Sequence, residues 1–382
     1  MRGLRRLVVL LLAALSALPA LLLLTLLFAG HDLRNGASHS ALRSAFLQKV
    51  EQKTGRGGAG DGQGLAAGAD PEADGAAAAD DDEDPGGADA AWMQGAAARM
   101  AARRRHLQLN CATYGLDQPG NDSLHRANPW EFFVERPHRL VWCNVFKAAS
   151  TSWMYNFNLL AGYSPAFLLK SKVVPLNLAR RKYPRPSLAD LQGALNDSVS
   201  FLIVRHPLER LLSAYRDKME YSLPHTFHQK LGTEIILKYR TSPPKFFPQG
   251  RKSSRRNTRW PTFPEFVRYL VDEHRKGQSF DMHWTPIAEF CTPCQVRFDV
   301  IAKFETLQED QNYLIHLAHL QKIIKPQWKN PAKGRTTKEV VAGYYSQLTK
   351  IQIFQLYNIY KYDFELFGYT LDGYMDMGTG AE

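Results

Sequence analysis

Two short segments, at residues 146–153 and 202–218, contain the residues of this chain best suited to bind phosphate. The first reads FKAASTSW and the second LIVRHPLERLLSAYRDK, and each has the pattern of a strand that runs into a helix through a short turn. Anions bind well to the exposed N–H groups at such helix starts. Together the segments predict one ligand with phosphate at both ends, held between two strand-to-helix junctions of a single α/β sheet.

The first segment has the chemistry of a phosphate loop. Residues 139–146 (RLVWCNVF) are mostly apolar, with β-branched and aromatic residues, which predicts a strand, and residues 153–163 have the apolar spacing of a helix. The small residues between them let backbone N–H groups approach an anion, and Lys147 adds a positive charge. The loop is not a Walker A motif, because Lys147 precedes the hydroxyl residues and no glycine is present. An ordinary helix cap by Ser150 or Thr151 explains the same residues equally well.

The second segment provides another position for an anion. Residues 199–204 predict a buried strand, and Pro207 suits the first turn of a helix. The helix has one apolar face, formed by Leu208, Leu211, Leu212, Tyr215 and Met219. Arg205 ends the strand and Ser213 lies on the opposite face of the helix, so the pair can hold one phosphate. The alternative is a structural salt bridge for Arg205 and a surface position for Ser213.

The N-terminal quarter of the chain predicts a membrane anchor and a stem. Residues 7–30 carry no charge and are long enough to span a bilayer, and the arginines at positions 2, 5 and 6 place the N-terminus in the cytosol. We expect a type II membrane protein with a cytosolic tail (1–6), a transmembrane signal-anchor (7–30), a flexible lumenal stem rich in Ala, Gly and Asp (31–105) and a lumenal domain (106–382). A cleaved signal peptide is the alternative, although its apolar stretch is usually shorter.

The expected lumenal domain is strongly basic. The chain has a net charge of +11, and residues 1–105 contain 12 Lys+Arg and 12 Asp+Glu, so the whole excess lies in residues 106–382. A lumenal domain of this charge favours an acidic polysaccharide as partner and argues against nucleic acid. The densest basic patch, a candidate substrate-binding surface, consists of Arg251, Lys252, Arg255, Arg256 and Arg259. A solvated loop without a partner explains this patch nearly as well.

The cysteines and sequons agree with an oxidising compartment. The chain has four cysteines: Cys111, Cys143, Cys291 and Cys294. Their even number predicts structural disulfides in one of three pairings. A zinc site at the pair 291 and 294 would need ligands from elsewhere, so disulfides are favoured. Asn121 and Asn196 begin N-x-Ser sequons and are the expected glycosylation sites.

The motifs resemble those of a known enzyme family. Residues 146–153 look like the 5′-phosphosulfate loop of sulfotransferases, and residues 203–218 look like their 3′-phosphate-binding strand and helix. Further similar motifs follow in consistent order at residues 283–294, 298–310 and 357–369. The set covers residues 108–370 and is similar to the Golgi carbohydrate sulfotransferases that modify chondroitin, dermatan and related glycans.

This resemblance implies a fold, a location and a sulfate donor. The fold would be α/β, with a central parallel sheet flanked by helices. The location would be the Golgi membrane, and the donor would be 3′-phosphoadenosine 5′-phosphosulfate (PAPS), without a required metal. The implied donor-binding residues are Lys147, Ala148, Ala149, Ser150, Thr151, Ser152 and Trp153 on the 5′ side, Arg205 and Ser213 at the 3′-phosphate, and Arg210. The chain departs from many relatives at Phe146, Ser150 and His206.

The implied reaction is in-line transfer of a sulfuryl group to a sugar hydroxyl. Lys147 would stabilise the charge that develops on the departing phosphate. The acceptor hydroxyl needs a base, and His283 in the HW motif is the first candidate. A histidine that only packs beside Trp284 or positions the substrate is at least as good an explanation of this motif.

The acceptor and some alternatives stay open. The commonest acceptor implied by the resemblance is the 4-hydroxyl of N-acetylgalactosamine in chondroitin or dermatan, but similar frameworks use terminal N-acetylgalactosamine or glucuronic acid. A lumenal kinase should have a Gly-rich loop and metal-binding acidic motifs, which this sequence lacks. A glycan-binding protein without activity does not account for Lys147 together with Arg205 and Ser213, whereas an inactive sulfotransferase does. The sequence does not indicate an oligomeric state.

Overall fold

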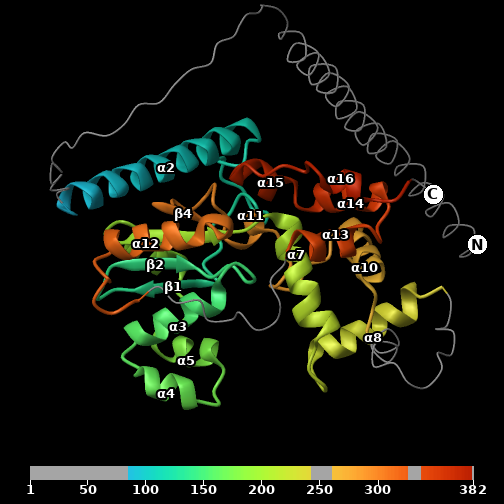
Figure 1. The fold of residues 1–382 in the computed structure, drawn as a ribbon, viewed down its shortest axis with the longest axis horizontal. Coiled ribbons are helices and arrows are strands. Elements are labelled where there is room, and N and C mark those ends of the chain that lie inside the picture. Colours follow the sequence, from blue (N-terminus) through green and yellow to red (C-terminus); the bar gives the residue numbers. More distant parts are fainter. Residues whose placement is uncertain (1–84, 242–259, 326–336, 381–382) are drawn as a thin grey trace, which may run out of the picture. The chain divides into compact units, whose positions relative to one another are not determined.

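The computed structural model describes residues 85–241, 260–325 and 337–380, all of which belong to one compact unit, Asp81–Glu382 (Figure 1). The expected anchor at residues 7–30, the stem up to residue 84 and the basic patch at residues 251–259 lie outside this part of the chain. Within the described part, no helix is both long and apolar enough to span a membrane.

A four-stranded sheet forms the centre of the unit, in the order β1-β2-β3-β4. The strands are β1 Phe132–Glu135, β2 Leu140–Cys143, β3 Val199–Val204 and β4 Val300–Lys303. Strands β2, β3 and β4 are parallel, and their buried residues are mostly apolar, as expected for strands covered on both faces. The carboxyl ends of these three strands therefore meet at one edge of the sheet.

The expected central parallel sheet is present in three strands, and the fourth strand is antiparallel. β1 pairs antiparallel with β2, so the sheet is mixed. The physical reason is the connection, because a turn of four residues can join only antiparallel strands, whereas a parallel pair needs a long crossover. The turn closes with a hydrogen bond from the Arg139 N–H to the Arg136 carbonyl, and Arg139 has φ of 52°.

Helices surround the sheet, and Figure 1 shows α2 and the group α3, α4 and α5 on opposite sides of it. The helices are α2 Pro85–Thr113, α3 Ser150–Leu160, α4 Pro165–Lys170, α5 Pro175–Lys182, α6 Leu188–Leu195, α7 Pro207–Tyr215, α8 Phe227–Tyr239, α10 Phe263–Arg275, α11 Ile287–Phe290, α12 Leu307–Leu317, α13 Lys338–Tyr345, α14 Lys350–Ile359, α15 Lys361–Phe367 and α16 Tyr374–Met377. A π-helical turn, η1 Arg216–Glu220, follows α7, and a 3₁₀ turn, η2 Phe304–Thr306, follows β4.

Helix α2 begins inside the segment that the sequence assigned to the flexible stem, so folded structure starts earlier than residue 106. Its residues Ala96, Met100 and Leu107 are buried in the main core, and Arg103 donates to the Ile301 carbonyl (2.8 Å) and to Asp310 (2.6 Å). Alanine has the highest helix propensity and its small side chain allows close packing. An alanine-rich sequence of low hydrophobicity can therefore become ordered when a folded sheet is available to pack against.

Two hydrophobic cores divide the described unit. The larger one surrounds the sheet, with Trp142, Trp153 and Phe201 at its centre. The second core joins α7, α8, α10, α13 and α14. The predicted apolar face of α7 is confirmed, since all five of its residues are buried in this second core. Helix α7 therefore begins at the sheet edge and extends into the helical half.

Candidate active site

The segment at residues 146–153 forms a turn at the carboxyl end of β2. Lys147 and Ala149 have φ of 69° and 56°, and Ala149 is the N-cap of α3. Ser150 and Thr151 are thus the first residues inside the helix, so the alternative in which one of them is an ordinary cap does not hold. No hydrogen bond of their hydroxyl groups is found within the described residues, and these hydroxyls lie beside the N–H groups of the helix start. Such a turn suits an anion.

The second segment meets this turn, as the sequence predicted for the two junctions. Arg205 follows β3 directly, and its Nη1 donates to the carbonyl of Lys147 at 3.4 Å. Its Nη2 donates to Glu209 at 3.2 Å, and its guanidinium lies 4.3 Å from the centre of the Phe304 ring, at the end of β4. Residues from all three parallel strand ends therefore surround one place at the sheet edge, where open α/β sheets bind ligands.

Arg205 has the properties of an anion-binding arginine. The residue is only 5% exposed, and its buried Nε has no hydrogen-bond partner within the described residues. A buried N–H without a partner is costly, and a phosphate oxygen would satisfy it. The arrangement therefore fits a bound phosphate group better than a closed structural salt bridge, in which the guanidinium would be fully paired.

Arg210 joins the turn to a third segment. It is 1% exposed, its Nε donates to the carbonyl of Phe146 (2.9 Å), and its Nη1 donates to the carbonyl of Thr285 (2.8 Å). Burial lowers the pKa of this guanidinium, and the negative charge of Asp363 opposes that effect. The side chain thus holds the start of the phosphate turn (residues 146–153) against the HW segment (residues 281–285, which include His283 and Trp284). Only its Nη2 lacks a partner within the described residues.

Lys147 points toward the π-helical turn η1. Its Nζ lies 3.2 Å from Asp217 Oδ2, and the same oxygen lies 3.3 Å from the Nζ of Lys218. Burial lowers the pKa of Lys147, an effect that Asp217 opposes and that Lys218 and Arg205 reinforce. π-Helical turns inside or after α-helices are common at functional sites. Here Asp217 of the turn pairs with two lysines, Lys147 from the other segment and Lys218 from the turn itself.

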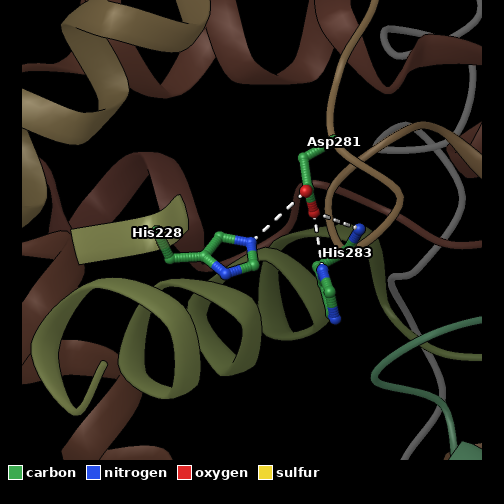
Figure 2. A group of neighbouring side chains, drawn as sticks. All are labelled: His228, Asp281 and His283. Atoms are coloured by element: carbon green, nitrogen blue, oxygen red, sulfur yellow. Dashed lines mark hydrogen bonds and ion pairs between the residues drawn. The ribbon is translucent and has the colours of Figure 1, made fainter. Parts of the chain in front are cut away.

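His283 lies beside the phosphate turn. Its ring centre is 4.9 Å from that of Phe146, the residue before Lys147. Its Nδ1 is 2.6 Å from Asp281 Oδ1, and its backbone N–H donates to the same oxygen. Figure 2 shows Asp281 between His283 and His228, with the second ring nitrogen of His283 directed away from the carboxylate. The histidine expected to be a base therefore has one nitrogen occupied and one available.

The protonation of this histidine follows from its surroundings. Burial lowers the pKa of His283 below its ordinary value of 6.5, and the positive charge of Lys218 acts in the same direction. Burial acts to raise the pKa of Asp281, but the hydrogen bonds from His228 and His283 outweigh it and hold that pKa well below its ordinary value. At neutral pH the pair is thus a carboxylate and a neutral imidazole.

Two disulfides hold the segments of the site together, which confirms the disulfides that the sequence predicted. Cys143, the last residue of β2, pairs with Cys291, and Cys111 pairs with Cys294. All four cysteines of the chain are therefore oxidised, and none is left for a zinc site. The first disulfide connects the strand before the phosphate turn to the region after His283.

The remaining predicted donor-binding residues have different environments. Trp153 is fully buried, with its ring centre 4.6 Å from that of Phe201 on β3, and Ala148 is buried below the turn. Ser213 is half-buried on α7. His206 is the N-cap residue of α7; its backbone N–H donates to Glu305 at 2.8 Å, and its Nε2 lies 3.0 Å from the carbonyl oxygen of Thr370. A carboxylate at this helix start is thus supplied from η2.

Other predicted sites lie away from this edge or outside the described residues. The basic patch of Arg251, Lys252, Arg255, Arg256 and Arg259 is not described. Asn121 and Asn196 are exposed, as glycosylation requires. Asn196 also borders a groove of about 1050 Å³ at the amino ends of β2, β3 and β4, together with Arg139, Val199 and Asp299. This groove is at the opposite end of the strands from the phosphate turn.

Sequence reasoning missed three polar residues near the site: Asp217, His228 and Asp281. Asp281 is two residues before His283, so the D-x-H spacing was a signal that could have been used. Asp217 lies within the second segment itself. His228 has no such signal, because it is 55 residues from His283 in the chain and reaches the cluster only through the placement of α8.

Comparisons with known proteins agree with this geometry. The sequence profile of the sulfotransferase family matches residues 130–370. Carbohydrate sulfotransferase 11 of Rattus norvegicus is 31% identical over 249 residues, which cover 64% of this chain and 68% of the relative. Carbohydrate sulfotransferase 9 of Homo sapiens is 32% identical over 273 residues, 70% of this chain and 59% of the relative. Carbohydrate sulfotransferase 10 of Xenopus laevis is 30% identical over 277 residues, which cover 70% of this chain and 75% of the relative. No solved structure matches the chain significantly.

The chain belongs to the sulfotransferase family, because the family profile matches more than half of it. The names of the relatives confirm the resemblance to carbohydrate sulfotransferases. The protein is therefore a sulfotransferase, and its family implies PAPS as the sulfate donor. The α/β fold, a mixed four-stranded sheet flanked by helices, fits this family.

Proposed function

We propose that this protein is a Golgi carbohydrate O-sulfotransferase that sulfates the 4-hydroxyl of N-acetylgalactosamine in chondroitin or dermatan. The observation that carries the proposal is the contact between Arg205 and the carbonyl of Lys147, which unites the two phosphate-suited segments at one sheet edge. The relatives named carbohydrate sulfotransferases support a glycan acceptor. The Golgi membrane location rests on the uncharged segment at residues 7–30 and on both disulfides.

The donor would be held by the residues that the sequence singled out. Lys147, the N–H groups at the start of α3 and the hydroxyls of Ser150 and Thr151 would bind the phosphosulfate, and Arg205 with Ser213 would bind the 3′-phosphate. The unpaired Nε of buried Arg205 supports this assignment. We expect no metal requirement, because Lys147 and Lys218 supply positive charge at the turn.

His283 would act as the general base for the acceptor hydroxyl. Its neutral ring lies against Phe146, next to Lys147, with one nitrogen free of Asp281. Donor PAPS supplies an activated sulfuryl group with a phosphate leaving group. The acceptor oxygen forms a bond to sulfur, its proton passes to Nε2 of His283, and the bond between sulfur and the phosphate oxygen breaks. Lys147 stabilises the charge on the departing oxygen.

Sulfate transfer from radiolabelled PAPS to a glycan panel tests this function. The panel contains chondroitin, dermatan, and glycans that end in N-acetylgalactosamine or glucuronic acid. We expect label in chondroitin or dermatan, and disaccharide analysis should locate it at the 4-position. Label only at another position or in another glycan contradicts the acceptor. Binding of the desulfated donor product, 3′-phosphoadenosine 5′-phosphate, without any transfer contradicts catalysis.

A further inference from the structure

His283 is the last member of a chain of three groups, and the other two, Asp281 and His228, have no role in the proposed reaction. Asp281 lies between His228 and His283, and its two carboxylate oxygens face one imidazole each: Oδ1 is 2.6 Å from His283 Nδ1, and Oδ2 is 3.3 Å from His228 Nε2 (Figure 2). The side chains are 13 to 17% exposed, so water competes little for these contacts. The cluster joins helix α8 to the HW segment.

The proton positions in this chain follow from the carboxylate. Ionised Asp281 accepts hydrogen bonds and donates none, so both nitrogens that face it must carry hydrogen. His283 is therefore held with its proton on Nδ1 and a lone pair on Nε2, which is the tautomer that a general base requires. The backbone N–H of His283 also donates to Oδ1, at 2.9 Å, which fixes the carboxylate relative to the ring.

His228 is held firmly enough to orient the carboxylate. Its ring centre lies 5.4 Å from Phe227, 5.3 Å from His283 and 5.9 Å from Trp284, all at steep interplanar angles. Trp284 is fully buried in the second core. The position of the His228 N–H thus depends on the packing of α8, and the second oxygen of Asp281 has this donor as its side-chain partner.

We propose that Asp281 and His228 are positioning residues for the base: Asp281 holds the productive tautomer of His283, and His228 holds Asp281. This inference rests on the proposed function, since it requires His283 to be the base. Two histidines and one carboxylate whose ligand atoms lie within 4.8 Å of one another are also of the kind that binds Zn²⁺. The two hydrogen bonds satisfy the same atoms without a metal, which favours the positioning role.

The groups that face His283 determine how its titration should respond. They are Asp281 from its own segment, His228 from α8 and Lys218 from η1, which is itself bonded to Asp217. When the His228 N–H is removed, His283 is the one remaining side-chain partner of the negatively charged Asp281 carboxylate. The imidazolium form of His283 then becomes more stable, and its pKa rises. The acid limb of the kcat profile should therefore move to higher pH.

The test compares full-length variants at His228 and Asp281. We expect His228→Ala to lower kcat about tenfold, the effect of one hydrogen bond to a charged group, with an unchanged KM for PAPS and a shifted acid limb. His228→Gln keeps an N–H near the position of Nε2, so it should retain most of the wild-type kcat and most of the wild-type position of the acid limb. Asp281→Asn can stabilise the wrong tautomer and should lower kcat on the order of a thousandfold. His274→Ala, at an exposed histidine of α10, serves as the matched control.

The outcomes separate this proposal from the proposed function. If His283→Ala retains turnover, the base assignment is wrong and the positioning roles fall with it. If His283→Ala is inactive but His228→Ala keeps the wild-type kcat and pH profile, only the role of His228 is overturned. Equal losses in His228→Ala and His228→Gln also overturn it. Treatment of the wild-type enzyme with EDTA should leave kcat unchanged, and a loss that Zn²⁺ restores would identify a metal site instead.

Discussion

The ammonium group of Lys147 is shared between a loop that suits an anion and a carboxylate 3.2 Å away, on Asp217. A bound donor must therefore compete with Asp217 for this lysine. Lys218 pairs with the same carboxylate oxygen, so the attraction of Asp217 for Lys147 is weakened and a donor can compete for Lys147. Asp217 thus partly neutralises Lys147, the residue proposed to bind the phosphosulfate, before a donor arrives, which limits the cost of burying its charge.

Substitution of the two basic residues at the turn tests the donor site. We expect Lys147→Ala and Arg205→Ala each to weaken binding of 3′-phosphoadenosine 5′-phosphate at least about tenfold, because each removes a charge-assisted hydrogen bond. Lys147→Ala should also lower kcat on the order of a hundredfold. Isothermal calorimetry and sulfate transfer measure these effects, with exposed Lys276→Ala as control. Unchanged donor binding in both variants would refute the site.

The pH dependence of kcat tests the role of His283. Burial lowers the pKa of this residue below 6.5, so the imidazole stays neutral at that pH and is protonated only at lower pH. A protonated ring cannot accept the acceptor proton, so kcat should fall as the pH decreases through this lowered pKa. We expect His283→Ala to lower kcat by a factor of about 10² to 10⁴, to lack the acid limb of the profile and to retain its affinity for the donor. Full turnover by this variant would exclude the base role.

Three elements hold the site together: the phosphate turn before α3, helix α7 with its π-helical extension, and the HW segment before α11. Arg210 of α7 donates to the backbone of both other elements, and the Cys143–Cys291 disulfide links β2, which precedes the phosphate turn, to the residue that follows α11. Buried Asp363 adds a further connection, since its carboxylate accepts from the N–H groups of Ile287 and Ala288. The elements therefore position one another through backbone contacts.

Replacement of Arg210 separates a supporting role from direct donor contact. Arg210→Met removes hydrogen bonds to the carbonyls of Phe146 and Thr285 and leaves Asp363 without its positive neighbour. We expect the free energy of unfolding to fall by about 3 to 5 kcal/mol, with weaker donor binding as a consequence. Urea denaturation with and without 3′-phosphoadenosine 5′-phosphate measures both. Unchanged stability with abolished donor binding would instead indicate that Arg210 contacts the donor directly.

The whole molecule combines a basic folded part with an expected polyanionic substrate. All of the net charge of +11 belongs to residues 106–382, and the densest basic cluster lies at residues 251–259, between helices α8 and α10. Helix α8 contributes His228 to the cluster around the expected base. We expect this segment to attract an acidic polymer through its charge alone.

Neutralisation of this basic segment should affect long acidic acceptors alone. We expect replacement of Arg251, Lys252, Arg255, Arg256 and Arg259 by Gln to raise the KM for chondroitin about three- to tenfold at low salt. The difference from wild type should shrink as the ionic strength increases, because salt screens exposed charges. Steady-state kinetics at several salt concentrations measure this. A small neutral acceptor provides the control, and an equal KM increase for that acceptor would contradict guidance by charge.

Local patterns predicted several elements of the fold and the two strand-to-helix junctions that meet at the sheet edge. The strand at residues 199–204 and the apolar face of α7 agree with prediction, because strand and helix periodicities depend on residues near in the chain. Helix α3 begins at Ser150 rather than at residue 153, since Lys147 and Ala149 adopt left-handed conformations that complete the turn early. Such conformations of non-glycine residues have no clear sequence signal.

Residue types and their short-range spacing thus sufficed to indicate a sulfotransferase and the donor that its family implies, and they led to the prediction that Lys147 and Arg205 bind the two phosphate ends. Contacts between distant segments required the folded chain: the ordering of α2 beside β4, the pairing of Cys143 with Cys291, the donation of Arg210 to two backbones and the approach of His228 to Asp281. The physical reason is that the residues suited to bind phosphate lie close together in the chain and form recognisable motifs. The partner of a buried polar group, in contrast, depends on which elements pack together.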